Sequence, residues 1–393
     1  MIREKIAQAA GILDELNIDL WLVFVRESGT NRDPSMDLVV GSGCTWQSAF
    51  CIHRSGETVA ILGSLDTAEV EKKGHYQRIV PYVGGIRDSL LQVLGELNPA
   101  SIALNWSLDN CLADGLTHGM FLQLEKLLAG TPWAGRFCSS EAVVAALRGR
   151  KTPEEIRRLK RVVEETERLY RDLCEHLRPG LTERQIADRL TAMTRERGFE
   201  PAWSTDHCPS CFTGVPRAGE AHTGPSDRPV ERGDVMNMDF GLRIDDYCSD
   251  LQRTWYVCRE GEETAPPEVE EGFRAVVDAI AEAAKAARPG VEGWVVDDVA
   301  RSLIVSRGFP EYPHALGHQV GRSAHDGGVL FCPRWERYGQ VPWQKIEEGQ
   351  VFTLEPRVPI AGHGVATVEE MIIVTPGGGE FISSFQRDLW LVK

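Results

Sequence analysis

Two segments of this chain recur at a constant distance, and this repeat is the feature that most restricts its fold. The recurring segments are residues 177–181 with 287–291, and 197–199 with 307–309, in each case 110 positions apart. In each copy of the repeat, the first segment (177–181 or 287–291) follows a charged stretch with helical spacing. A Pro-Gly pair in that segment marks the end of the helix. Unless common tripeptides recur here by coincidence, the chain contains two related halves. Their sheets would pack together, with a ligand site where the halves meet.

A first pair of acidic residues is expected on a β-hairpin in the earlier half. Residues 235–240 alternate in polarity, residues 247–257 are rich in aromatic and β-branched side chains, and two aspartates between them supply turn chemistry. With the turn centred between positions 244 and 245, Asp239 would lie directly opposite Asp250. Cross-strand partners have Cβ atoms about 4.5–5.5 Å apart. Two such aspartates would repel each other unless a cation lies between them.

A second acidic pair is expected on a hairpin in the later half. Residues 351–355 and 365–369 flank a Gly-His-Gly turn, which places Glu355 opposite Glu369. Pro356 and Pro359, between the first arm and the turn, make this register less certain. Glu370 is the alternative, because a one-residue slip turns the neighbouring side chain to the same face. A single strand carboxylate is usually solvated, but two facing pairs predict a site for divalent metal ions, which are suited to hydrolysis.

Histidines accompany these carboxylates. His314, His318 and His325 lie in a glycine-punctuated stretch that reads as loop, and His222 precedes the first acidic pair by less than twenty residues. A lone histidine is more often a hydrogen-bonded polar group than a ligand. Histidines clustered beside paired carboxylates favour an imidazole contribution to the same metal site.

At these residues the chain resembles the pita-bread metallopeptidases, which include aminopeptidase P, prolidase, methionine aminopeptidase and their divergent relative creatinase. The resemblance covers residues 150–393 strongly and the preceding residues more weakly. It implies an α/β creatinase-type N-terminal domain over residues 1–147, followed over residues 148–393 by an α+β pita-bread catalytic domain made of two related halves. The family's ligands occur in the order Asp, Asp, His, Glu, Glu, and the matching positions are Asp239, Asp250, His318, Glu355 and Glu369.

The resemblance also implies an activity. Two divalent ions, with manganese favoured by the oxygen-rich ligands and zinc, cobalt or iron as alternatives, would serve an Xaa-Pro aminopeptidase or dipeptidase. Glu355 would shuttle a proton as well as bind metal. His325 and His222 would donate to the substrate carbonyl or the oxyanion, and His314 would shape the substrate pocket. A homodimer is implied as well.

Three positions depart from the family pattern. Arg357 stands where Glu-Pro-Gly usually ends, Thr367 replaces the arginine that often precedes the last ligand by two, and Ala315 replaces a glycine between two histidines. No ligand is lost, so we expect metal binding to be retained. Thr367 leaves proline selectivity open. The alternatives are a hydrolase of small non-peptide amides or C–N bonds, as in creatinase, and a binding protein without catalysis.

Composition restricts the possible binding partners and cellular location of the protein. The formal charge of −15 argues against a nucleic-acid partner. No apolar run approaches the ~20 residues that span a bilayer, and no leader pattern opens the chain, so we expect a soluble cytoplasmic protein without a membrane partner. Ten scattered cysteines suit a reducing compartment. Cys208 and Cys211 form a single CxxC, which we expect to be structural rather than a zinc or redox site.

Overall fold

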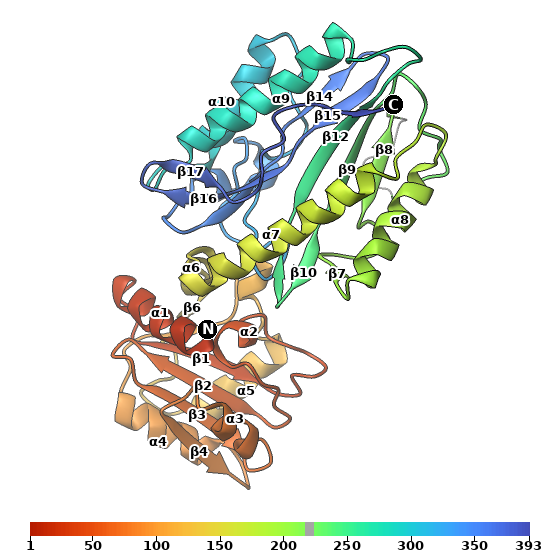
Figure 1. Cartoon of the computed structure of the whole chain (residues 1–393). Coiled ribbons are helices and arrows are strands. Elements are labelled where there is room, and N and C mark those ends of the chain that lie inside the picture. The colour runs from red at the N-terminus through yellow and green to blue at the C-terminus, as the bar shows by residue number, and fades with distance from the viewer. Residues whose placement is uncertain (217–223) are drawn as a thin grey trace. The chain divides into compact units, whose positions relative to one another are not determined.

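The computed structural model describes residues 1–216 and 224–393. Its contacts divide the chain into two compact units, Met1–Arg148 and Gly149–Lys393 (Figure 1). The expected boundary between residues 147 and 148 lies one residue from this division. Among the described residues, no helix combines the length and the apolar character needed to cross a membrane.

The N-terminal unit is built on one six-stranded sheet in the order β4-β3-β2-β1-β5-β6. Strand β1 is apolar and buried along its whole length, as expected for the middle of a sheet covered on both faces. The strands are β1 (Leu20–Val25), β2 (Ser48–His53), β3 (Thr58–Gly63), β4 (Arg78–Tyr82), β5 (Ile102–Leu104) and β6 (Phe137–Ser139). The helices are α1 (Ile2–Glu15), α2 (Met36–Val39), α3 (Thr67–Lys73), α4 (Arg87–Leu97), η1 (Cys111–Ala113), α5 (His118–Leu128) and α6 (Glu141–Gly149).

The first half of the C-terminal unit begins with a long helix whose start the sequence specifies. Thr152 and Glu155 form a reciprocal capping box, and Pro153 occupies the first turn. The helices are α7 (Pro153–Cys174) and α8 (Glu183–Glu196). The strands are β7 (Glu200–Pro201), β8 (Ser210–Thr213), β9 (Val235–Phe240), β10 (Leu242–Ile244), β11 (Tyr247–Cys248) and β12 (Leu251–Val257). Strands β12, β9 and β8 form one sheet in that order, and β11, β10 and β7 form a small one.

The second half follows the same plan with an added hairpin. Its main sheet has the order β13-β16-β17, and β14 pairs with β15. The helices are α9 (Pro267–Ala286), α10 (Gly293–Ser306), η2 (Glu336–Tyr338) and η3 (Val341–Trp343). The strands are β13 (Val351–Leu354), β14 (Arg357–Ile360), β15 (Gly364–Thr367), β16 (Glu370–Thr375), β17 (Gly378–Phe381) and β18 (Trp390–Val392), of which β18 joins the sheet of the first half.

The repeat predicted from the sequence is confirmed in backbone detail. Helices α8 and α10 begin and end 110 positions apart. Gly180 and Gly290, from the two Pro-Gly pairs, both take positive φ, at 90° and 85°. Their amides make the same bond, to the carbonyls of Val230 and Ile346, at 2.8 Å in each half. The duplication therefore extends from sequence to hydrogen bonding.

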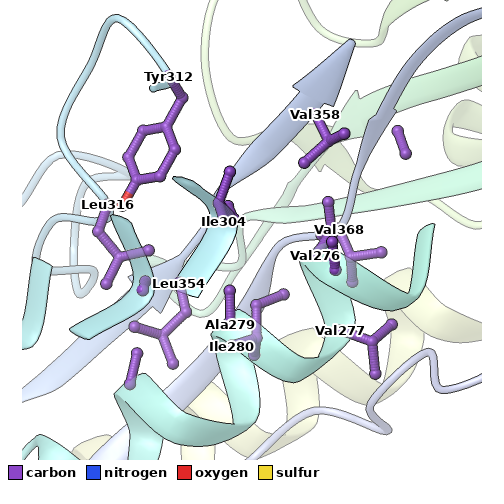
Figure 2. Close-up of a cluster of buried hydrophobic side chains, with 14 of the residues drawn as sticks. Val276, Val277, Ala279, Ile280, Ile304, Tyr312, Leu316, Leu354, Val358 and Val368 are labelled. Atoms are coloured by element: carbon purple, nitrogen blue, oxygen red, sulfur yellow. The ribbon is translucent and has the colours of Figure 1, made fainter. Parts of the chain in front are cut away.

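A hydrophobic core under α9 and α10 supports the second half (Figure 2). Val276 and Ile280 of α9 lie in one cluster with Val358 of β14 and Val368, which precedes β16. Helix and hairpin approach closely at Gly272, where an added Cβ would lie 2.8 Å from the Ile360 side chain. Burying a large aliphatic side chain contributes about 1.5–3 kcal/mol. This core fixes which face of the β14–β15 hairpin turns away from α9.

Candidate metal centre

The first acidic pair lies on one face, but its predicted register is wrong by two residues. Asp245 and Asp246 both have positive φ, 51° and 66°, and form a two-residue turn centred between them. Asp239 therefore lies opposite Gln252 rather than Asp250. A shift of two residues keeps a side chain on its face. Asp239 consequently still lies close enough to Asp250 for its charge to raise the pKa of that carboxyl group.

The second register is confirmed. Leu354 pairs with Glu370 and Arg357 pairs with Thr367, so the intervening Glu355 and Glu369 face each other. The alternative ligand Glu370 turns to the opposite face, where it is buried, lies 3.1 Å from the Arg253 guanidinium and accepts a bond from the Gln386 amide. Glu370 thus stabilises the layer behind the site.

His318 joins these carboxylates although it lies far from them in sequence. Its Nε2 is 3.4 Å from Glu355 Oε1, 3.7 Å from Asp250 Oδ2 and 3.9 Å from Glu369 Oε1. One ligand atom each from Asp250, His318 and Glu369 lie within 4.8 Å of one another. Strand β13 holds the histidine in place, because the His318 amide donates to Thr353 Oγ1 and the Thr353 amide donates to the His318 carbonyl.

The electrostatics of this cluster are unfavourable without a cation. Burial raises the pKa of Asp239 to about 7 and those of Asp250, Glu355 and Glu369 well above their ordinary range, and neighbouring carboxylates raise the latter three further. Among the described residues, Asp239 Oδ1 and both oxygens of Glu369 are buried without a hydrogen-bond partner. Unpartnered buried carboxylates cost on the order of several kcal/mol. Metal ions would offset this cost.

The donor set fits divalent ions. Burial, and secondarily His325, lower the pKa of His318 to about 3, so its imidazole is neutral, as metal ligation requires. Carboxylate oxygens with one imidazole suit manganese, iron, cobalt and zinc alike. We therefore take this cluster as the candidate metal centre.

The other three predicted histidines differ in what the structure places around them. The ring of His325 lies 4.2 Å from that of His318, and His325 is exposed, so it lies beside the cluster at the protein surface. His314 is partly buried, its Nδ1 is 2.8 Å from the Ala315 carbonyl, and its ring contacts Tyr312. His222 lies outside the described residues.

Sequence reasoning missed a polar chain that ends on Glu355. Gln252 Nε2 donates to Glu355 Oε2 at 3.4 Å, and Thr367 Oγ1 donates to Gln252 Oε1 at 2.6 Å. Gln252 also bonds Glu369 through both backbone groups, joining the two halves. Strand alternation could have suggested Gln252, because it follows Asp250 by two positions.

The single CxxC takes no part in the centre. Cys208 and Cys211 are free and buried, and burial raises the pKa of Cys208 to about 12 and that of Cys211 further. Such thiols are poor nucleophiles and poor ligands. Within residues 1–216 and 224–393, neither belongs to a group able to hold a metal ion.

Comparisons with known proteins agree with this geometry. Metallopeptidase family M24 matches residues 157–376, more than half of the chain. The Xaa-Pro dipeptidase of Pyrococcus furiosus is 29% identical over 255 residues, which are 64% of this chain and 68% of that protein.

Solved structures extend the likeness over the whole chain. The X-Pro aminopeptidase of Thermotoga maritima is 26% identical, with 98% of this chain and 99% of that one covered at a TM-score of 0.71. The Xaa-Pro dipeptidase of Bacillus anthracis covers 100% of both chains at 23% identity and a TM-score of 0.75. The α/β N-terminal unit followed by a duplicated pita-bread unit is therefore the fold expected from the sequence. The chain belongs to metallopeptidase family M24 and is a metal-dependent hydrolase.

Proposed function

We propose that this protein is an Xaa-Pro peptidase, acting as an aminopeptidase or a dipeptidase on proline-containing peptides. The observation that carries the proposal is the buried cluster that brings four carboxylates together with one neutral imidazole. Relatives named for Xaa-Pro cleavage add support, since both the sequence and the structural comparisons include them.

The metal site would consist of the five predicted ligands, which are Asp239, Asp250, His318, Glu355 and Glu369. Two divalent ions held there, with manganese the first candidate, would lower the pKa of a water molecule and polarise the scissile carbonyl. Gln252 holds one oxygen of Glu355 and leaves the other oriented toward His318.

The remaining catalytic roles are assigned to side chains of this protein. Glu355 would accept a proton at its carboxylate and deliver it to the leaving amine. His325, beside the cluster at the protein surface, would donate a hydrogen bond to the carbonyl oxygen as negative charge develops there. His314 would shape the pocket, and His222 is assigned a donor role from the family resemblance alone.

We further propose a homodimer located in the cytoplasm. The family resemblance supports the dimer, and the ten free cysteines support a reducing compartment. Light scattering of the purified protein tests the dimer directly.

The decisive experiment is a substrate panel with controlled metal. Xaa-Pro dipeptides, Xaa-Pro tripeptides, matched peptides with alanine in place of proline, and small non-peptide amides are assayed with added manganese and with chelator. We expect manganese-dependent cleavage of the proline peptides alone. Cleavage of only the small amides would replace the proposal with a creatinase-like activity, and no cleavage would favour a binding protein.

A further inference from the structure

Residues 316–320 run beside β13 and carry one of the proposed metal ligands. The Glu355 amide donates to the Leu316 carbonyl at 2.8 Å, and the Thr353 amide donates to the His318 carbonyl at 2.9 Å. The two segments pair in the antiparallel sense. This pairing fixes the backbones of His318 and Glu355 relative to each other.

The loop that leads into this segment is held by a buried ion pair of α10. Asp297 and Arg301 lie about one helical turn apart and are only 1% and 7% exposed. Arg301 Nε donates to one carboxylate oxygen of Asp297 at 2.8 Å, and Nη2 donates to the other at 2.9 Å. Two parallel bonds of this kind fix the plane of the guanidinium.

Both members of the pair also bond the backbone of the adjacent loop. Arg301 Nη1 donates to the Tyr312 carbonyl at 2.7 Å, and Nη2 donates to the His314 carbonyl at 2.9 Å. Asp297 Oδ1 accepts from the Leu316 amide at 3.0 Å, and this amide also donates to a backbone carbonyl at 2.7 Å. One ion pair thus binds alternate residues of a loop that lies outside the helices and strands.

The guanidinium is enclosed by aromatic rings as well. Its central carbon lies 4.1 Å from the ring centroid of Tyr312 and 5.0 Å from that of Trp335. Tyr312 and Leu316 belong to the hydrophobic core of this half, together with Ile304 of α10 (Figure 2). The loop is therefore attached to α10 through both its backbone and its side chains.

Comparison of the two halves shows that a helix of this plan forms without the ion pair. The equivalent positions of α8, 110 residues earlier, are Ala187 and Thr191. There the Thr191 hydroxyl donates to the Ala187 carbonyl, and no charge is involved. The ion pair occurs in the half whose loop carries His314 and His318. This difference indicates a task in the loop rather than in the helix.

We propose that Asp297 and Arg301 are positioning residues of the peptidase site, which hold the loop from Tyr312 to His318 in place against Glu355. This inference rests on the peptidase function proposed above and adds to it two residues that act through the backbone. Without the pair, two carbonyls lose their donors, and the loop would shift relative to β13. A displacement of about 1 Å near reacting groups can lower a rate by about 10²-fold.

The test uses substitutions chosen to preserve the fold. Arg301→Lys retains the charge beside Asp297, but a single ammonium group cannot replace a forked and stacked guanidinium. The double variant Asp297→Asn with Arg301→Gln removes both charges together, so that neither is left buried alone. Arg168→Met is the matched control, because it removes an exposed ion pair of the same spacing, to Glu164 on α7.

Each variant is assayed well below its thermal midpoint with manganese at saturation. We expect kcat/KM for an Xaa-Pro dipeptide to fall about 10- to 100-fold in both test variants. Bound metal should stay near the wild-type amount, because the proposed ligands Asp239, Asp250 and Glu369 lie on other segments. The Arg168→Met variant should match the wild type.

A second readout separates positioning from stability. The visible absorption spectrum of the cobalt-loaded protein reports the geometry of the metal ligands. We expect this spectrum to shift in both test variants and to remain unchanged in Arg168→Met. An ion pair with a purely structural role would change the thermal midpoint alone.

The outcomes are distinguishable. Unchanged activity together with an unchanged cobalt spectrum in the test variants overturns this inference, whatever the thermal midpoint, and leaves the Xaa-Pro activity standing. Failure of the wild type to cleave any proline peptide overturns the proposed function, and the cobalt spectra then decide between a positioning and a structural role. A loss of cleavage with retained metal and a shifted spectrum supports the assignment.

Discussion

The two halves of the C-terminal unit share a plan and differ in what their hairpins carry. In the first half, a two-residue turn closes the β10–β11 end of the hairpin, and the acidic residues are two aspartates. In the second half, the extra strands β14 and β15 extend the hairpin, and the acidic residues are two glutamates. The second half also supplies His318. Duplication thus accounts for the scaffold of the site, and the added hairpin and loops account for its asymmetry.

Equivalent positions in the two hairpins show which residues differ between the halves. Asp239 and Glu355 are both four residues beyond the start of their strands, and their cross-strand partners are Gln252 and Glu369. Gln252 and Glu369 then bond each other across the junction of the halves. One half therefore has an amide where the other has a carboxylate. The amide supports Glu355 without adding a further negative charge.

Removing one proposed metal ligand from either half should have the largest effect. Asp250→Ala in the first half and His318→Ala in the second should each lower kcat by about 10³-fold or more and reduce bound metal, because both halves complete one centre. Metal content measured by elemental analysis and kcat are the readouts. Asp246→Asn, in the turn of the first hairpin, is the control. Full activity in either ligand variant would refute the centre.

The pH dependence of the free energy of unfolding should reveal the effect of burying carboxyl groups from both halves in one cluster. A carboxyl group whose pKa is raised by folding binds its proton more tightly when folded, so its stabilising contribution is lost as pH rises. For Asp239 the loss runs from about pH 4 through about pH 7. His318, with its pKa lowered to about 3, has the opposite sign, but its effect is complete above about pH 6.5.

Metal-free protein should therefore lose unfolding free energy between pH 6.5 and pH 8, by about 0.8 kcal/mol from Asp239 alone, and Asp250, Glu355 and Glu369 act in the same direction. Denaturant titration in the presence of chelator measures this loss. Saturating manganese should remove it, and Asp239→Asn should reduce it. A metal-free protein that is more stable at pH 8 than at pH 6.5 would contradict the assigned directions.

Replacing the amide that distinguishes the halves should have a moderate effect. Gln252→Ala removes one hydrogen bond to Glu355, which is worth about 0.5–1.5 kcal/mol, so kcat should fall up to about tenfold while metal content stays near that of the wild type. Gln252→Glu makes the halves symmetric and should instead destabilise the metal-free protein. Thr367→Ser, which keeps the hydroxyl, is the matched control.

The smallest expected effect tests whether the halves are equivalent as scaffolds. Gly180→Ala and Gly290→Ala both place a Cβ at positive φ, and neither added Cβ would meet an atom within 4 Å. The cost is therefore conformational, about 1–2 kcal/mol in each half. Thermal midpoints of the two variants should fall by similar amounts. Gly119→Ala, within α5, should show no such loss.

Local sequence signals predicted much of this architecture because they act over short distances. The Pro-Gly pairs of the repeat and the Gly-His-Gly turn each restrict φ and ψ locally, and each led to a confirmed element. The predicted register of the first hairpin is wrong because the centre of its turn was misplaced. Residues 245 and 246 both occupy the turn, and moving its centre by one residue moves the register by two.

Other features depend on contacts that no local pattern contains. Pro356 cannot donate to a strand ladder, and the expected long arms are divided there into β13 and β14, and opposite it into β15 and β16. The bond from Gln252 to Glu355 joins residues 103 positions apart. Which faces these side chains share follows from how α9 packs against the second hairpin.

The sequence by itself determined which acidic residues and histidine are available to a metal ion, their order along the chain, and the duplicated halves, since these follow from residue types and from the repeat. Only the tertiary structure decided that His318 lies within 3.4 Å of Glu355 and that Glu370 turns to Arg253. The physical reason is distance along the chain. Such contacts exist only once separate elements have packed, and packing depends on the whole core.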